Sequence, residues 1–159
     1  MLSDHSLARL GEVHPELMRR IIRLDVLVPM LSVQVTRGHC TVAQQDALYA
    51  QGRTTPGPIV TNATGYQSAH VYGYAADLVP EDVMPGQPNW DVNSAAWQKM
   101  LAAGLAVGLA EGAKWEHKDN PHFYLQELPA TPTDEMRTLL INGGLQALWQ
   151  SWALLLETS

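Results

Sequence analysis

Histidine and aspartate side chains in two short stretches of the chain could together hold a metal ion. The first stretch contains His70 and Asp77, and the second contains Asp119 and His122. Imidazole and carboxylate groups are common zinc ligands, and a catalytic zinc keeps three protein ligands and one position for water. His70, Asp77 and His122 therefore form a candidate metal site for hydrolytic chemistry, with Asp119 near the bound water.

The spacing of the first pair places a condition on the chain between its members. Residues seven apart point to opposite faces of a straight strand, so His70 and Asp77 can share a metal only if the chain bends. Gly73 is the natural position for that bend. On a helix the same offset would place both on one face, but the Val, Tyr and Gly content argues against a helix.

The composition limits the classes of protein to consider. The 159 residues suit one domain, and 46% hydrophobic residues can build a core without disulfides. The single cysteine, Cys40, excludes an intrachain disulfide and a cysteine-based zinc cluster. The net charge is −6 and the basic residues are scattered, which predicts no nucleic-acid partner.

The chain shows no pattern of a secretory signal or of a membrane span. The most apolar run, residues 102–110, is too short and too rich in glycine to cross a bilayer, which predicts no stable membrane insertion. We expect a monomer that stays in the cytoplasm until it is released.

The pattern of apolar residues, caps and turns predicts an α+β domain with a small antiparallel sheet flanked by helices. No linker divides the chain, so residues 1–159 are expected to be one domain. The expected helices are 15–28, 41–50 after a capping box of Thr41 and Gln44, one beginning at Ser94, and a closing helix at about 133–156. The expected strands are 31–36, 71–79, 114–116 and 122–125, and the expected long loops are 52–68 and 80–93.

The two candidate stretches resemble the motifs of a known family. Residues 68–77 match Ser-x-His-x-x-Gly-x-Ala-x-Asp, which is similar to the zinc-site motif of the M15 metallopeptidases. That group contains D-Ala-D-Ala carboxypeptidases, L-alanyl-D-glutamate endopeptidases and many phage endolysins. Residues 119–123 resemble its second metal motif, and residues 48–54 and 56–63 are similar to its endolysin-like branch. The resemblance covers about residues 10–126.

The resemblance implies a role for each matching residue. One zinc ion would be bound by His70, Asp77 and His122. Asp119 would be the general base, and Ser68 would support the site or the substrate. The implied activity is hydrolysis of the L-Ala–D-Glu bond in the stem peptides of cell-wall peptidoglycan, as in a phage endolysin.

One position departs from the family pattern. Relatives carry an arginine in a Gly-x-Arg-Thr/Ser segment, where it is thought to hold the substrate carbonyl and the developing oxyanion. Here Cys40 stands at that position, and a thiol cannot supply the cationic fork of a guanidinium group. Either Arg37 or Arg53 reaches into the site instead, or the enzyme is weak or differently specific.

Two other functions remain open from the sequence. One is a D-Ala-D-Ala carboxypeptidase or dipeptidase, and the other is a zinc-containing wall-binding module with weakened catalysis, which Cys40 supports. The other histidines are expected to be structural or surface residues, and the tryptophans are expected to lie in the core rather than to stack on sugars.

Overall fold

The computed structural model describes residues 1–81 and 86–157, and a four-stranded antiparallel sheet lies at its centre. The strands follow the order β1-β2-β4-β3 across the sheet, and they are β1 (Val33–Arg37), β2 (Ala75–Pro80), β3 (Leu109–Glu111) and β4 (His122–Leu125). The helices are α1 (Asp4–Leu10), α2 (Pro15–Leu27), α3 (Val42–Ala50), α4 (Ala95–Ala106), α5 (Asp134–Ser151) and α6 (Ala153–Glu157). Short 3₁₀ turns are η1 (Gly65–Gln67), η2 (Ala69–Tyr72) and η3 (Gly112–Lys114). This arrangement confirms the expected α+β class.

Helix starts follow the capping residues that the sequence offers. Thr41, Ser94 and Thr133 each accept a hydrogen bond from a backbone N–H in the first turn of the following helix. Such a cap satisfies a donor that has no partner within the helix. Pro15 occupies the first turn of α2, where its missing N–H costs nothing.

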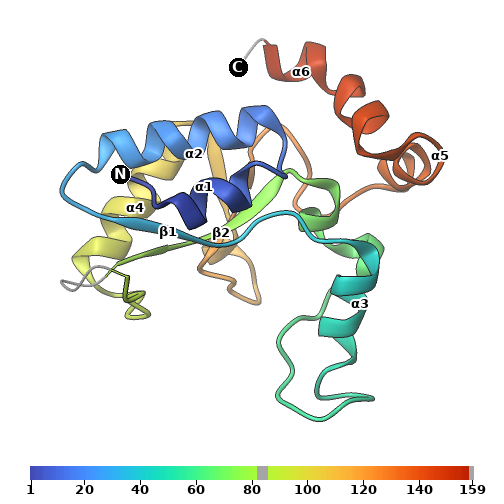
Figure 1. Ribbon diagram of the computed structural model, residues 1–159, viewed down its shortest axis with the longest axis horizontal. Coiled ribbons are helices and arrows are strands. Elements are labelled where there is room, and N and C mark those ends of the chain that lie inside the picture. The colour runs from blue at the N-terminus through green and yellow to red at the C-terminus, as the bar shows by residue number, and fades with distance from the viewer. Residues whose placement is uncertain (82–85, 158–159) are drawn as a thin grey trace.

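The core lies between one face of the sheet and the pair of helices α2 and α4, which pack against each other (Figure 1). Leu78, Phe123 and Leu125 are fully buried on that face. At Gly104 of α4 a Cβ atom would lie 2.7 Å from the ring of Phe123, so this helix approaches the sheet closely because the residue is glycine. Each fully buried apolar side chain contributes about 1.5–3 kcal/mol, and this packing fixes the sheet.

Two of the expected strands are corrected by the structure. The strand expected at 71–79 begins only at Ala75, because Ala69–Tyr72 forms the η2 turn and Gly73 closes it in a left-handed conformation with φ 75°. The strand expected at 114–116 is wrong. The edge strand is β3, which can pair with β4, whereas residues 112–114 form the η3 turn.

The C-terminal segment is not the single helix that the sequence predicts for 133–156. Gly144 has φ 69° and ψ −175°, which no α-helix contains, so α5 consists of two helical parts at an angle to each other. The chain turns again at Trp152 before α6. The N-terminal helix α1 was not expected.

The long loop after α3 projects with that helix from the rest of the molecule (Figure 1). It confirms the loop expected at 52–68, apart from the η1 turn. Of the loop expected at 80–93, residues 82–85 lie outside the described residues.

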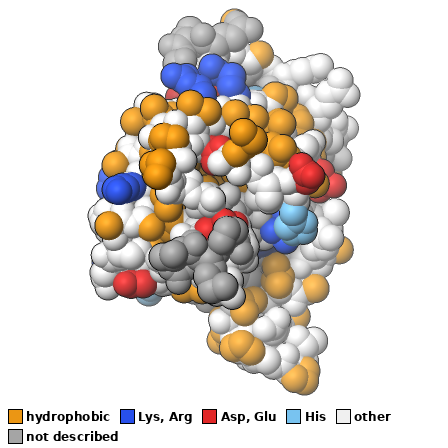
Figure 2. Space-filling model, turned by 60° about the vertical axis from the view of Figure 1, so that its left-hand side comes forward, with side chains coloured by type: hydrophobic (Ala, Val, Ile, Leu, Met, Phe, Trp, Pro, Cys, Tyr) orange, Lys and Arg blue, Asp and Glu red, His pale blue; other side chains and the backbone are white. Residues whose placement is uncertain are grey.

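Charged side chains are dispersed over the surface. On the face that Figure 2 presents, hydrophobic side chains are frequent, and Lys and Arg occur in small separate groups. No helix in the described part of the chain is long and apolar enough to cross a membrane.

A buried arginine of α2 bonds to a residue just before β3 and to a residue just after β4. Arg20 is 3% exposed, and it donates hydrogen bonds to Glu16, to Glu127 and to the carbonyl of Gly108. Burial alone would raise the pKa of Glu16, but the hydrogen bonds and charges of Arg19 and Arg20 hold it below its usual value. The network therefore stabilises the fold when Glu16 is ionised.

We predict that Arg20→Met lowers the free energy of unfolding by about 3–5 kcal/mol, because it removes the buried cation that bonds to both Glu16 and Glu127. The matched control is Arg19→Met, which removes a 54% exposed arginine from the same Glu16 and should cost less than about 1 kcal/mol. Urea unfolding at pH 7 measures both.

The pKa of Glu16 is lowered in the folded state, so its stabilising contribution is complete above its unfolded value of 4.5 and is lost as the pH falls through the folded value. The difference between the wild type and Arg20→Met should therefore shrink on acidification. Equal losses for the two arginine variants at pH 7 would contradict the role assigned to the buried network.

Candidate metal centre and its cleft

Three candidate residues lie in one row across the sheet. Asp77 of β2 is the direct partner of His122 on β4 and of Arg37 on β1. Side chains of residues directly opposite each other in an antiparallel pair project from the same face. The sheet therefore brings an aspartate, a histidine and an arginine together from segments that are far apart in the sequence.

His70 reaches the same place through the η2 turn. The backbone N–H of Gly73 donates to the carbonyl of His70 at 3.1 Å, and the left-handed conformation of Gly73 then leads the chain into β2. The bend expected between His70 and Asp77 is confirmed at Gly73, although His70 lies in a 3₁₀ turn and not in a strand. The side chain of His70 is buried.

The two imidazoles converge on one oxygen of Asp77. Nε2 of His70 lies 3.1 Å from Oδ1 of Asp77, and Nδ1 of His122 lies 3.3 Å from the same oxygen. One ligand atom from each of the three residues lies within 4.8 Å of the other two. A metal ion could be held where at least three histidine, cysteine or acidic side chains lie this close together. Among the described residues, His70, Asp77 and His122 form such a group.

The hydrogen bond between His70 and Gly38 favours a cation between these groups. Nδ1 of His70 lies 2.9 Å from the carbonyl oxygen of Gly38, which can only accept, so Nδ1 carries a proton. In the neutral imidazole Nε2 then presents a lone pair to the carboxylate of Asp77, and two acceptors repel each other. A metal ion or an added proton removes this repulsion, and a carbonyl that fixes the distal nitrogen is typical of metal-binding histidines.

The two aspartates of the site have pKa values shifted in opposite directions. Burial alone would raise the pKa of Asp77, but the two neighbouring imidazoles hold it well below its usual range, so Asp77 stays ionised. The pKa of Asp119 is raised, because the cleft removes part of its hydration and the charge of Asp77 lies nearby. One carboxylate is thus suited to bind a cation and the other to exchange a proton.

The candidate metal centre opens into a cleft of about 500 Å³. One wall is formed by residues 59–63 of the long loop, and the other by residues 115–119 between β3 and β4. Asp119 is exposed on the second wall, and buried Ser68 contributes to the lining beside His70. The cleft is therefore an accessible groove with the candidate ligands at its base.

Arg37 enters the cleft because β1 contains a bulge. The register runs Val35 opposite Leu78 and then Arg37 opposite Asp77, so Thr36 is an extra residue without a partner of its own. In a regular strand Arg37 would project from the face of Val35, which is fully buried. The bulge turns the arginine to the face of the metal centre instead.

Cys40 supports this arginine and is not part of the ligand group. Nη2 of Arg37 donates to Sγ of Cys40 at 3.2 Å and also to Oε1 of Gln45. Burial raises the pKa of the Cys40 thiol, which keeps it protonated and a poor metal ligand. The position that departs from the family pattern thus contacts an arginine supplied by the neighbouring strand.

Arg53, the other candidate arginine, supports the wall of the cleft from outside. Its guanidinium donates to the carbonyls of Tyr49 and Thr61 and to the side chain of Asn62, and it stacks on the ring of Tyr49 at 4.0 Å. Thr61 and Asn62 line the cleft, whereas Arg53 is not among the described lining residues.

Gln45 is a site residue that the sequence analysis missed. Its fully buried side chain accepts from Arg37, and its Nε2 donates to the carbonyl of Ala63 at 2.8 Å and to Oγ1 of Thr61 at 3.3 Å. It thereby connects the arginine to the loop wall. A glutamine in the first turns of a capped helix gives no sequence signal for this contact.

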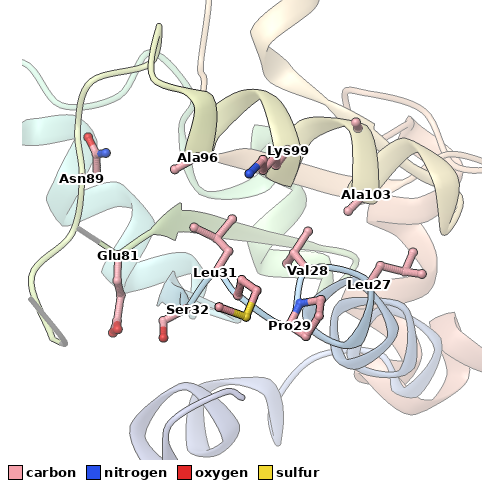
Figure 3. A pocket seen from close by; sticks show the side chains of 12 residues that line it. Leu27, Val28, Pro29, Leu31, Ser32, Glu81, Asn89, Ala96, Lys99 and Ala103 are labelled. Carbon is pink, nitrogen blue, oxygen red and sulfur yellow. The ribbon is translucent and has the colours of Figure 1, made fainter. Parts of the chain in front are cut away.

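The protein has a second cavity of about 950 Å³, which Figure 3 shows from close by. The segment 27–32 faces α4 across it, and its lining is mainly aliphatic. Lys99 and Glu81 are the charged side chains among its described lining residues, and it shares none of these with the cleft. The chemistry therefore belongs to the smaller cleft.

Comparison with known proteins agrees with this assignment. Residues 61–125, which carry both motifs, match the M15 peptidase family model described as D-alanyl-D-alanine carboxypeptidase. The family model matches these residues alone, which are less than half of the chain. The resemblance identified from the two motifs is thereby confirmed.

Two proteins that this chain resembles have names that state an activity. The peptidoglycan L-alanyl-D-glutamate endopeptidase CwlK of Bacillus subtilis (strain 168) is 34% identical over 100 residues, which cover 58% of this chain and 59% of CwlK. The crystal structure of the L-Ala D-Glu endopeptidase ChiX of Serratia marcescens matches with a TM-score of 0.53 and 26% identity. That match covers 79% of this chain and 90% of ChiX. The alignment with CwlK thus leaves about two fifths of that protein unmatched.

We predict that this protein binds one zinc ion and that His70→Ala and His122→Ala each abolish this binding, because a site with two ligands left holds the ion weakly. The matched control is His117→Ala, which removes an exposed histidine that lines the same cleft. Equilibrium dialysis with metal analysis gives the stoichiometry. Retention of the ion by both ligand variants would contradict the site.

Proposed function

We propose that this protein is a zinc-dependent peptidase that hydrolyses the L-Ala–D-Glu bond in the stem peptides of peptidoglycan. The observation that carries the proposal is the convergence of two imidazoles on one carboxylate, beside a second carboxylate with a raised pKa. Both relatives are named as endopeptidases for that bond, which supports the choice of substrate.

In this proposal His70, Asp77 and His122 hold the zinc ion. When bound, the ion would act as a Lewis acid and lower the pKa of a water molecule bound to it toward about 7. Asp119 accepts the proton of the attacking water and passes it to the leaving amine nitrogen. A carboxylate with a raised pKa suits both steps, because its proton affinity is closer to that needed near neutral pH.

Arg37 is the residue that we propose for binding the substrate carbonyl. It lines the cleft, and its guanidinium is held by Gln45 and Cys40 in a row with Asp77. A fixed cation there can stabilise negative charge that develops on the carbonyl oxygen. Ser68 contributes to substrate binding beside His70, and Arg53 acts through the loop wall that it supports.

A D-Ala-D-Ala carboxypeptidase is the second candidate, because the matching family model carries that description. The two functions share the metal site, and they differ in the bond that the cleft admits. A zinc-containing wall-binding module is a weaker candidate, since the cation missing at Cys40 is present at Arg37.

The remaining sequence-based expectations stay predictions. These are a single domain over residues 1–159, a monomeric state, no nucleic-acid partner, and release from the cytoplasm to act on the wall, as in a phage endolysin. They do not affect the assignment of the reaction.

We predict that Asp119→Asn keeps its zinc ion and loses turnover by a factor of at least about 10². The substitution preserves shape and removes the proton acceptor. The measurement is mass analysis of purified peptidoglycan digested by the zinc-loaded protein, with and without a chelator.

The products of the wild type identify the bond. Chelator-sensitive release of stem peptides cut after L-alanine supports the endopeptidase, and release of terminal D-alanine supports the carboxypeptidase. No cleavage by a zinc-loaded wild type would leave wall binding as the function. Full activity of Asp119→Asn would show that another group is the base.

We predict that Arg37→Met lowers kcat/KM by about 10²–10³-fold with zinc content unchanged, because it removes the cation facing the substrate carbonyl. Arg53→Met is the control. Its loss of kcat/KM should be smaller, because it changes only the support of the loop wall. Equal losses in the two variants would contradict a direct role for Arg37.

A further inference from the structure

We propose that Trp149, in the C-terminal helix α5, is a positioning residue for the metal ligand His70. The inference rests on the proposed metal site. It extends the functional unit beyond residues 61–125, which match the family model, to a helix that those residues do not include.

Trp149 is bonded to the turn that carries His70. Its indole Nε1 donates to the carbonyl oxygen of Tyr72 at 2.9 Å, and Tyr72 is the last residue of η2. The indole also covers Gly73, where a Cβ atom would lie 2.7 Å from Cζ2 of Trp149. The ring thus lies directly on the left-handed residue that bends the chain from His70 toward Asp77.

A second contact holds the same bend. The backbone N–H of His14 donates to the carbonyl of Gly73 at 2.8 Å, and its imidazole packs against the indole of Trp149 with ring centroids 5.3 Å apart. The carbonyls of Tyr72 and Gly73 are therefore both occupied by donors from other parts of the fold. His14 is a structural residue, as the sequence analysis expects.

The break in α5 brings Trp149 to this position. After Gly144 the second part of the helix runs onto η2, and Leu148 and Trp152 anchor it in the core. Trp152 packs against the rings of His14 and Tyr74, with centroids 5.8 and 5.6 Å apart. The position of Trp149 is thus set by the packing of Leu148 and Trp152 as well as by its bond to the turn.

The turn needs this support because of its length. A four-residue 3₁₀ turn has few internal hydrogen bonds and poor bond geometry, so its own stability is low. The direction of the His70 imidazole follows from this turn and from the bond to Gly38. Groups that orient a metal ligand from outside typically change metal affinity by about 10–100-fold when they are removed.

The test compares two tryptophans with the same kind of bond. Trp97 in α4 is fully buried, and its Nε1 donates to the carbonyl of Asn89 at 2.7 Å. It is not among the described residues that line the cleft, and its indole donor bonds to the loop before α4 rather than to η2. Trp97→Phe and Trp149→Phe each remove one indole donor, and both are expected to lower the free energy of unfolding.

We expect Trp149→Phe to bind zinc about 10-fold more weakly than the wild type, and Trp97→Phe to keep the wild-type affinity. Competition with a chromophoric chelator measures the affinity of the full-length folded proteins, and urea unfolding gives their stability. With cobalt in place of zinc, the visible absorption should shift in Trp149→Phe alone, because the geometry at His70 changes.

Equal zinc affinity in Trp149→Phe and the wild type, with unchanged cobalt spectra, would overturn the positioning role. Equal weakening in both tryptophan variants would also overturn it, since affinity would then follow general stability. A wild type that binds no zinc would overturn the proposed metal site itself, so the two failures are distinguishable.

Discussion

The pairing of β2 with β4 is the constraint on which the candidate site depends. Asp77 faces His122 directly in this register, and β1 adds Arg37 on the other side of Asp77. A shift of the register by one residue would turn alternate side chains to the opposite face. The apolar face that holds the register is the one packed under α2 and α4, where Leu78, Phe123 and Leu125 are fully buried. Core packing on one face thus determines the positions of polar groups on the other.

The bulge at Thr36 uses this register to place a cation. Thr36 has no residue opposite it, and its hydroxyl donates to the backbone carbonyl of Asp77 at 3.2 Å. The extra residue reverses the direction of the next side chain, so Arg37 faces the cleft rather than the core. Gln45 of the following helix and Cys40, which precedes that helix, then accept hydrogen bonds from its guanidinium. The thiol at position 40 accepts a hydrogen bond from the arginine that the neighbouring strand supplies.

The site combines a rigid base with walls formed by loops. Asp77 and His122 lie on central strands, whereas the wall at residues 59–63 belongs to the projecting loop (Figure 1). Ile59 and Val60 in that wall are exposed, and Gln45 and Arg53 bond to neighbouring residues of it. Strands packed in a core open less readily than loops with few buried contacts. Under the proposed function, the sheet fixes the positions of the candidate metal ligands, and the loop provides the surface that selects the peptide.

The sequence by itself determined the features that depend on local chemistry. The caps at Thr41, Ser94 and Thr133 act within one helical turn, and the bend at Gly73 follows from the spacing of His70 and Asp77. The ligand group also follows from two short motifs, because ligand type and spacing are local properties.

Only the tertiary structure decided the features that depend on distant partners. Arg37 reaches the cleft through a bulge that exists relative to β2, and the edge strand is β3 because β4 can pair with it. Gly144 breaks the closing helix where its second part turns onto the η2 turn, and Trp149 contacts a carbonyl 77 residues away. Such contacts are set by packing between segments, which no local pattern of residue types encodes.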